Sequence, residues 1–304
     1  MLESINTLIV IAGPTAVGKT SITVKIADEI HCEIISADSR QFFKELSIGI
    51  AKPTQKEMMG IPHHFVDFIS INEEFSAGKF EVATLNLLPR LFKKNNHVIM
   101  TGGSGLYIQA VCQGMNDIPD VDISFREELY KELEIHGLSP LLEELNIKDP
   151  EYFHSVDQNN PQRIIRALEV CRGAGKPYSS FRTDQKIQRD FKVLKIGLER
   201  EREELFSRID IRMDEMIAAG LFEEAIEFQD KRQLNALKTV GYKEIFAYLD
   251  GEYDKTEAIR LLKRNSRRYA KRQMTWFKKD PEFLWFHPDD IDGILKYISG
   301  EIKR

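Results

Sequence analysis

Short apolar runs alternate with amphipathic stretches through the first third of the chain. The apolar run at residues 7–12 (TLIVIA) predicts a buried strand, and a helical pattern follows from about 19 to 31. Further strands are predicted at 33–36 and at 97–101, the second of them after a helical stretch at 80–94. This order of strands and helices is typical of a parallel sheet covered by helices.

The pattern becomes purely helical after residue 114. Residues 124–172 are helical throughout, apart from breaks predicted at 137–140 and 149–150. Residues 191–198 (FKVLKIGL) then alternate like a strand again. The helical stretch therefore reads as an insertion between strands of one sheet.

The C-terminal third is mostly helical as well. Residues 200–279 predict helix, with breaks near Gly220 and Gly241, and residues 283–286 (FLWF) predict a last strand. The simplest layout is an α/β core with an all-helical insertion domain. Its predicted parts are residues 1–114 and 191–304 for the core and 115–190 for the insertion.

A phosphate-binding loop follows the first predicted strand. Residues 13–20 (GPTAVGKT) match G-x-x-x-x-G-K-[ST] at every fixed position, and they open a helix, which is the context that this motif requires. Backbone N–H groups and the helix N-terminus would cradle a phosphate there, and the sheet would be P-loop NTPase-like. The predicted phosphate contacts are Gly13, Pro14, Thr15, Ala16, Val17, Gly18, Lys19 and Thr20, with the Thr20 hydroxyl as a Mg²⁺ ligand.

A second glycine-rich string at residues 173–177 (GAGKP) only resembles such a loop. No strand precedes it, and Pro177 takes the place of the hydroxyl residue. Because it follows a predicted helix that ends near Arg172, we interpret it as a helix C-cap and turn.

The strand ends carry an unusual distribution of carboxylates. Many phosphate-loop enzymes have an Asp after a later strand, but the strand at 97–101 runs into 102–105 (GGSG). This absence argues against a motor or switch GTPase and leaves a small-molecule kinase open.

Asp38 instead ends the second predicted strand, where a ligand crevice opens in parallel sheets. Asp38 could act as general base, assist Mg²⁺ or cap a turn, and Ser104 should lie on the same rim.

Composition limits the classes of partner. Hydrophobic residues make up 42% of the chain and charged residues 30%, and the net charge is −5. A protein that is basic overall is excluded, although a local basic face is not. Three dispersed cysteines argue against zinc ribbons, iron–sulfur sites and disulfide scaffolds. No signal peptide or membrane span is evident, so we expect a cytoplasmic protein without membrane association.

One segment near the C-terminus concentrates positive charge. Residues 260–279 contain nine basic and no acidic residues, which predicts a local phosphate-binding face. Trp276 and Phe277 close this stretch, and anchoring in the core is favoured over stacking on bases. The basic residues are Arg260, Lys263, Arg264, Arg267, Arg268, Lys271, Arg272, Lys278 and Lys279.

Taken together, these motifs resemble the tRNA dimethylallyltransferases, also called tRNA isopentenyltransferases, over nearly the whole chain. No C-terminal zinc finger of the eukaryotic kind is present, which implies the bacterial form. Departures are Phe42-Phe43, Ile50 and Ser104, and they bear on substrate contacts more than on the reaction. The likeness rests on residues 13–20, 38–41 (DSRQ), 48–53 (IGIAKP), 62–64 (PHH), 101–107 (TGGSGLY), 160–170 (NPQRIIRALEV), 175–177, 240–244 (VGYKE) and 269–277 (YAKRQMTWF).

The resemblance implies a reaction. Enzymes of this family move a dimethylallyl group from dimethylallyl diphosphate to N6 of the adenosine 3′-adjacent to the anticodon in tRNA. The products are N6-isopentenyladenosine and diphosphate. The phosphate loop would then bind a diphosphate leaving group with Mg²⁺, which accounts for the missing strand-end Asp. Lys19, Thr20, Asp38 and Ser104 are the implied catalytic residues, with Asp38 as the base.

The resemblance also implies how the anticodon stem-loop is bound by a monomeric enzyme. The target base would leave its stack and enter the site, and the helical insertion would touch the RNA. For residues 162–166 a solvated basic helix face is the alternative, and His63 and His64 are assigned only a loop-positioning role. The implied RNA contacts are Asp38, Ser39, Arg40, Gln41, Ser104, Arg126, Gln162, Arg163, Ile164, Ile165, Arg166, Lys238, Thr239, Val240, Gly241, Tyr242 and Lys243.

Two other functions stay open at this point. A small-molecule or nucleotide kinase would share the phosphate loop and consume ATP, but it leaves the basic stretch at 260–279 without a role. A non-enzymatic RNA-binding module would use that stretch but leaves Asp38 and Ser104 without one. Labelled ATP and labelled dimethylallyl diphosphate separate the three.

Overall fold

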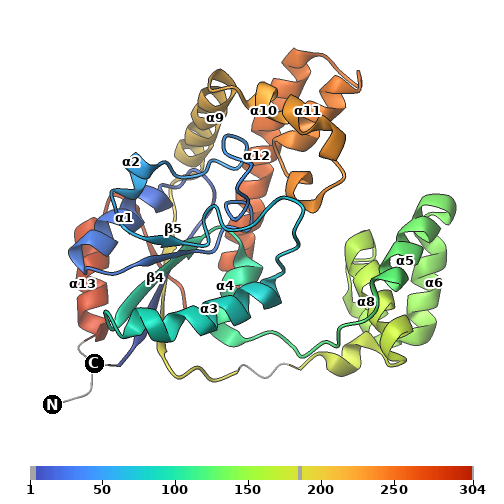
Figure 1. Cartoon of the computed structure of the whole chain (residues 1–304), viewed down its shortest axis with the longest axis horizontal. Coiled ribbons are helices and arrows are strands. Elements are labelled where there is room, and N and C mark those ends of the chain that lie inside the picture. The colour runs from blue at the N-terminus through green and yellow to red at the C-terminus, as the bar shows by residue number, and fades with distance from the viewer. Residues whose placement is uncertain (1–4, 184–186, 303–304) are drawn as a thin grey trace. The chain divides into compact units, whose positions relative to one another are not determined.

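The computed structural model describes residues 5–183 and 187–302. The chain forms two compact units (Figure 1). Unit 1 comprises the residues up to 113 and from 188 onward, and unit 2 comprises residues 114–187. The sequence placed the insertion at 115–190, so the two divisions differ by at most three residues at each boundary.

Unit 1 contains a six-stranded sheet in the order β3-β2-β4-β1-β5-β6, and every neighbouring pair is parallel. The register sets Ala12 at the end of β1 opposite Gly102 of β4 and Gly197 of β5, so these strands end at one level. The strands are β1 (Thr7–Ala12), β2 (Ile34–Ser36), β3 (His63–His64), β4 (His97–Gly102), β5 (Lys192–Leu198) and β6 (Leu284–Phe286).

Helices cover both faces of this sheet (Figure 1). Leu8 and Val10 of β1 pack in a core with α3 (Ala77–Phe92) and α4 (Gly105–Gln113). Ile9 and Ile11 face the other way, toward α1 (Lys19–Glu29) and α13 (Ile291–Ile302). Because both faces are buried, β1 is apolar at nearly every position and does not alternate.

The helices that follow β5 form a layer on which the functional site depends. They are α9 (Arg202–Ala218), α10 (Leu221–Glu227), α11 (Tyr242–Leu249) and α12 (Lys255–Phe277). Gly220 and Gly241 precede α10 and α11 with φ of 103° and 109°, which confirms both predicted breaks. A third break, between α11 and α12, was not predicted, and neither were α13 or the short elements β3 and α2 (Gln55–Met58).

Unit 2 is a bundle of four helices around Leu129, Leu145, Ile164 and Leu168. The predicted breaks at 137–140 and 149–150 separate α5 from α6 and α6 from α7, whereas the break at 156–160 before α8 was not predicted. Gly175 has φ of 65°, and its N–H donates to the Cys171 carbonyl at 3.1 Å, so the second glycine-rich string is a C-cap, as predicted. The helices are α5 (Ile123–His136), α6 (Ser139–Lys148), α7 (Pro150–Ser155) and α8 (Pro161–Ala174).

Among the described residues, no helix has the length and apolar character needed to cross a membrane.

Candidate active site in unit 1

The phosphate loop connects β1 to α1 and is closely packed from behind. A Cβ atom on Gly13 would lie 2.7 Å from the Leu198 carbonyl oxygen of β5, so only glycine fits there. Gly18 has φ of 111° and Ala16 has φ of 62°, both in the left-handed region. The loop therefore has the curvature that turns successive N–H groups toward a bound anion at the start of a helix.

Lys19 lies along the inside of this loop. Its Nζ donates to the carbonyls of Gly13 (3.0 Å) and Pro14 (2.8 Å). Burial lowers its pKa to about 8, which the carboxylate of Asp38 opposes and the guanidinium of Arg212 reinforces. A bound dianion would add negative charge beside the ammonium and so favour its protonated form.

A cavity of about 460 Å³ opens beside the loop. It brings together segments that are far apart in the chain: the phosphate loop, the turn after β2, helix α9, the residues before α11 and one face of α12. The polar residues that line it include Thr15, Lys19, Thr20, Asp38, Arg40, Gln41, Arg208, Arg212, Thr239, Tyr269 and Gln273. Five of the eight predicted phosphate contacts line it, whereas Gly13, Pro14 and Val17 lie behind.

Asp38 lines this cavity from the turn after β2. Its Oδ1 accepts a hydrogen bond from the Arg40 N–H at 3.1 Å, so one oxygen closes the turn. Within the part of the chain that the structure describes, Oδ2 has no hydrogen-bond partner. The turn-capping role and the chemical role considered from the sequence are therefore compatible, because they use different oxygens.

Ser104 braces the same turn from the end of β4. Its Oγ accepts from the Ser39 N–H at 2.9 Å and donates to the Ser39 Oγ at 3.0 Å. Its own N–H donates to the Ala37 carbonyl at 3.2 Å. These contacts place Ser104 beside Asp38 in the structure, but the residue that it holds directly is Ser39.

Helix α9 contributes two arginines that the sequence analysis did not select. The Arg208 Nε donates to the Ala16 carbonyl at 2.9 Å, and the Arg212 Nη2 donates to the Ala51 carbonyl at 3.4 Å. Burial lowers the pKa of Arg212, and Asp38 partly offsets this. The only sequence signal was a pair of arginines one helical turn apart, which does not show that the helix faces the phosphate loop.

Helix α12 adds Gln273 and Tyr269. The buried amide of Gln273 accepts from the Thr15 N–H and donates to the Gly103 carbonyl, each at 2.9 Å, so it ties the phosphate loop to the end of β4. Burial, together with the nearby Asp38 charge, raises the pKa of Tyr269 to about 12. Tyr269 is therefore a neutral hydrogen-bond donor at neutral pH.

The segment before α11 reaches the cavity through Thr239, Val240 and Gly241. Tyr242 itself is fully buried, and its hydroxyl donates to Glu224 at 2.6 Å. Its side chain therefore supports the cavity wall from inside, whereas Lys238 and Lys243 are exposed.

Glu224 links this segment to a second wall of the cavity. Its carboxylate also accepts the N–H groups of Ser47, Ile48 and Gly49, at 2.7–2.9 Å. The turn after β2 is tied to the residues before α11 as well, because Arg40 donates to the Asn235 carbonyl at 2.7 Å.

Eight of the nine basic residues of 260–279 separate into two groups, and the ninth, Arg264, donates to the side chain of Asn265. Four are paired with carboxylates: Arg260 with Glu257, Lys263 with Asp214, Arg267 with Asp210 and Lys278 with Glu199. Four others have no carboxylate partner among the described residues. They line a hollow of about 350 Å³ together with Thr275 and Trp276: Arg268, Lys271, Arg272 and Lys279.

The two aromatic residues at the end of α12 behave differently. Phe277 is 2% exposed, which confirms the predicted core anchor, whereas Trp276 is 39% exposed, and the same prediction is wrong for it. Trp276 lies against Gly105, whose Cβ, if present, would be 2.2 Å from the indole ring. The basic hollow therefore adjoins the loop that carries Ser104.

Unit 2 carries the other predicted RNA contacts. Gln162 and Arg163 are exposed at the start of α8. Arg126 and Arg166 share the buried carboxylate of Glu169, with contacts of 2.9–3.1 Å. Two cations on one acid leave net positive charge at this surface. Ile164 and Ile165 lie in the core of unit 2, so their side chains do not face solvent.

The histidine pair is structural in this fold. His63 Nδ1 bonds the Ile61 carbonyl at 2.8 Å, and His64 Nε2 bonds Glu33 at 2.7 Å. The two rings thus engage different partners. Across residues 5–183 and 187–302, no group of three or more His, Cys, Asp or Glu residues could hold a metal ion.

Comparison with known proteins gives consistent results. The sequence profile of the family described as "IPP transferase" matches residues 41–280. A tRNA dimethylallyltransferase of Cytophaga hutchinsonii is 53% identical over 297 residues, which cover 98% of both chains. The tRNA dimethylallyltransferase 1 of Bacteroides fragilis is 49% identical over 298 residues, covering 98% of this chain and 99% of the relative.

Solved structures resemble the fold over a similar length. The tRNA isopentenylpyrophosphate transferase of Bacillus halodurans has a TM-score of 0.72 and 37% identity, covering 98% of this chain and 97% of the other. A eukaryotic dimethylallyltransferase acting on tRNA has a TM-score of 0.73 and 26% identity, covering 92% of this chain and 74% of the other. The predicted P-loop NTPase-like core is confirmed.

Proposed function

This chain belongs to the IPP transferase family, and we propose that the cavity of unit 1 transfers a dimethylallyl group from dimethylallyl diphosphate to a tRNA adenosine. The acceptor is N6 of the adenosine 3′-adjacent to the anticodon, and the products are N6-isopentenyladenosine and diphosphate. One observation carries the assignment: a complete phosphate loop shares one cavity with an Asp38 oxygen that has no hydrogen-bond partner among the described residues. The comparisons favour this tRNA-modifying transferase over the kinase alternative.

The phosphate loop would hold the diphosphate leaving group. Negative charge grows on that group as the carbon–oxygen bond breaks, and fixed donors aimed at it lower the barrier. The N–H groups of the loop, Lys19 and Arg212 are such donors, and they need no rearrangement of the chain to reach the cavity. Lys19 would exchange its contacts with the Gly13 and Pro14 carbonyls for phosphate oxygens.

The residues present fit a Mg²⁺ ion carried by the diphosphate. The Thr20 hydroxyl, which lines the cavity, is an oxygen ligand of the kind that Mg²⁺ prefers. The ion would neutralise part of the diphosphate charge.

Asp38 would act as the base. An adenine N6 amine is a weak nucleophile, because its lone pair is delocalised into the ring. The Oδ2 atom of Asp38 is available to take the amine proton, while Oδ1 keeps the turn closed. The hydrogen bonds of Ser104 to Ser39 would hold this turn in place during proton transfer.

Apolar side chains offer a place for the five-carbon tail. The cavity is lined by two methionines of α9, Met213 and Met216, by Val240 before α11, and by Ile50 from the loop after β2. A water-poor wall protects an allylic centre with cation character from capture by water. Methionine side chains also adapt their shape to a small branched group.

The RNA would be held by basic residues in both units. In unit 1, the hollow of Arg268, Lys271, Arg272 and Lys279 adjoins the loop of Ser104 and can accept backbone phosphates. Lys238 and Lys243 are exposed and lie in sequence on either side of the segment that lines the cavity. In unit 2, Gln162, Arg163, Arg166 and Arg126 would form a second contact. Ser39, Arg40 and Gln41, which were also assigned to the RNA, follow Asp38 directly in the turn after β2. We further propose a monomer that acts in the cytoplasm.

Parallel incubations test this function. Purified protein is mixed with Mg²⁺ and an anticodon stem-loop RNA that contains consecutive adenosines, and either labelled dimethylallyl diphosphate or labelled ATP is added. Label in RNA from the prenyl donor, and its loss in Asp38→Asn with donor binding retained, supports the proposal. Turnover of ATP without RNA labelling would instead favour the kinase.

A further inference from the structure

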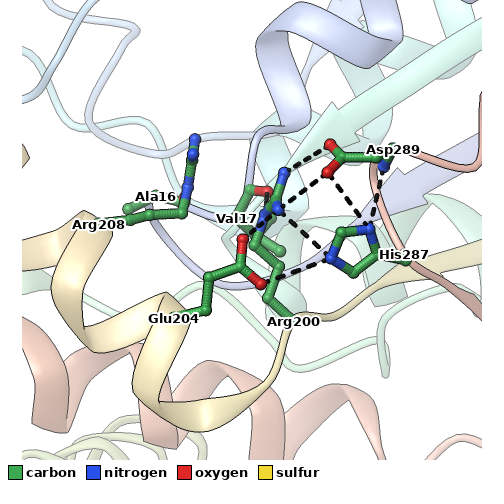
Figure 2. Close-up of polar contacts among 7 residues, drawn as sticks. All are labelled: Ala16, Val17, Arg200, Glu204, Arg208, His287 and Asp289. Carbon is green, nitrogen blue, oxygen red and sulfur yellow. Dashed lines mark hydrogen bonds and ion pairs between the residues drawn. The ribbon is translucent and has the colours of Figure 1, made fainter.

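A network of polar contacts centred on Arg200 adjoins the phosphate loop (Figure 2). Arg200, in the segment between β5 and α9, donates from Nε to the Val17 carbonyl at 2.9 Å. Its side chain is only 7% exposed. Arg200 is not among the residues that line the cavity, so its contact with the loop is made through the backbone alone.

The rest of the Arg200 guanidinium is engaged by carboxylates. Its Nη2 pairs with Asp289 Oδ1 at 2.9 Å, its Nη1 pairs with Glu204, and His287 Nε2 lies 3.3 Å from Nη1. Glu204 belongs to α9, whereas His287 and Asp289 lie between β6 and α13. Figure 2 shows Arg200 at the centre of these groups, beside Val17. With two acids beside it, its charge is balanced before any ligand binds.

The hydrogen bond from Arg200 to the Val17 carbonyl also fixes the direction of the Gly18 N–H. In a planar trans peptide, the C=O and the N–H of the same unit point in opposite directions. The Val17 carbonyl shares its peptide unit with the Gly18 N–H. Because Arg200 holds this carbonyl outward, the Gly18 N–H must point inward, toward the cavity. Within the described residues the Gly18 N–H has no hydrogen-bond acceptor.

The same network also lies within van der Waals distance of Gly18. Gly18 has φ of 111°, and a Cβ there would lie 3.6 Å from Pro288 and 3.7 Å from the Arg200 guanidinium. One residue earlier, Arg208 donates to the Ala16 carbonyl, and both of these residues line the cavity, so this second contact is made from the cavity side.

We propose that Arg200, clamped by Glu204 and Asp289, is a positioning residue that presets the Gly18 N–H for the diphosphate of the donor. The segment at 287–289 thereby becomes part of the donor site, although it does not line the cavity. This inference rests on the proposed function, since it takes the phosphate loop as the diphosphate site.

The test compares full-length Arg200→Met, Asp289→Asn and a matched control, Asp214→Asn, which breaks the exposed pair with Lys263. Binding of inorganic pyrophosphate with Mg²⁺ is measured by calorimetry. Steady-state constants are measured for the donor and for the stem-loop RNA. The Gly18 amide is followed by NMR in protein labelled with ¹⁵N-glycine. Asp289→Asn keeps Arg200 in place and serves if Arg200→Met folds poorly.

We expect Arg200→Met to weaken pyrophosphate binding and to raise the donor KM by about tenfold, the effect of one misdirected hydrogen bond to a charged group. Asp289→Asn should act in the same direction by about two- to threefold. The RNA KM and the control variant should be unchanged, and the Gly18 amide shift on pyrophosphate addition should shrink in Arg200→Met.

Three results would contradict parts of this account, and they are distinguishable. If wild type does not bind pyrophosphate, the proposed function of the loop fails. If wild type binds it and a folded Arg200→Met binds it equally, the positioning role fails. If the KM values for donor and RNA rise together in Asp289→Asn, the network merely supports the fold.

Discussion

Replacing Lys19 by Met should raise the Tm of the protein measured without ligand. It should also remove the rise in Tm that pyrophosphate causes in wild type. The structure holds the Lys19 ammonium in a buried position, and burial lowers its pKa from 10.5 to about 8. The folded state therefore disfavours the charged form relative to the unfolded chain. This cost is present in full below pH 8, and it disappears as the pH rises from 8 toward 10.5, where the unfolded chain also loses the proton.

The magnitude follows from the size of the pKa shift. A shift from 10.5 to about 8 corresponds to about 3 kcal/mol at neutral pH. Methionine removes this cost, but it also removes the hydrogen bonds to the Gly13 and Pro14 carbonyls, each worth about 1 kcal/mol. The net expectation is a gain of about 1 kcal/mol, or a rise in Tm of about 2–4 °C for a domain of this size.

Thermal unfolding at pH 7, with and without Mg²⁺ and pyrophosphate, measures both effects. Wild type should gain Tm on adding pyrophosphate, and Lys19→Met should start higher and gain almost nothing. Lys25→Met on the same helix, where the side chain is exposed, is the matched control and should behave as wild type. A lower Tm for Lys19→Met without ligand, or an unchanged pyrophosphate response, would refute the reasoning.

Three further changes test other parts of the site. Asp38→Asn should lower kcat by about 10²–10⁴-fold with the donor KM within about threefold of wild type, as measured by RNA prenylation; an unchanged kcat would exclude Asp38 as base. Arg268→Gln should raise the RNA KM several-fold and reduce the slope of log KM against log salt by about 0.7–0.9. Arg260→Gln should leave the RNA KM and this slope unchanged, because Arg260 is already paired with Glu257. Phe277→Ala should cost about 3–5 kcal/mol in the free energy of unfolding by urea titration, and Trp276→Ala should cost under about 1 kcal/mol; equal costs would contradict their different burial.

The parts of this site that were predictable are those that depend on neighbours in sequence. The phosphate loop is one short segment whose glycines, lysine and hydroxyl residue have fixed roles, so its spacing alone identifies it. Asp38 was predictable because the carboxyl ends of parallel strands share one edge of the sheet. The helix breaks at Gly220 and Gly241 follow from backbone conformations that favour glycine.

The unpredicted parts depend on how distant segments meet. Arg212 and Gln273 enter the cavity only because α9 and α12 lie against the phosphate loop. Nothing local to either residue indicates that contact. Tyr242 lies in a recognisable motif, yet it is buried, because Glu224 from α10 receives its hydroxyl. The two-residue strand β3 is too short to give a periodic signal.

The charges of α12 also depend on contacts between distant segments, which the sequence does not show. Sequence counting predicts a basic stretch, but it does not tell paired from unpaired cations. In the fold, Lys263 and Arg267 meet carboxylates of α9, while Arg268 and Lys271 face the hollow beside Trp276. The second group retains charge that is available to a phosphate backbone.

Locating the prenyl group in the RNA tests the proposed transfer to the adenosine N6. Protein, Mg²⁺ and dimethylallyl diphosphate are incubated with an anticodon stem-loop RNA and with a matched RNA in which inosine, which has no N6 amine, replaces the target adenosine. Nucleosides are identified by mass spectrometry, and released diphosphate is measured. We expect one N6-isopentenyladenosine, 3′ to the anticodon, for each diphosphate released. The inosine RNA should give no product. Prenylation at another position, or diphosphate release without modified RNA, would contradict the proposed transfer.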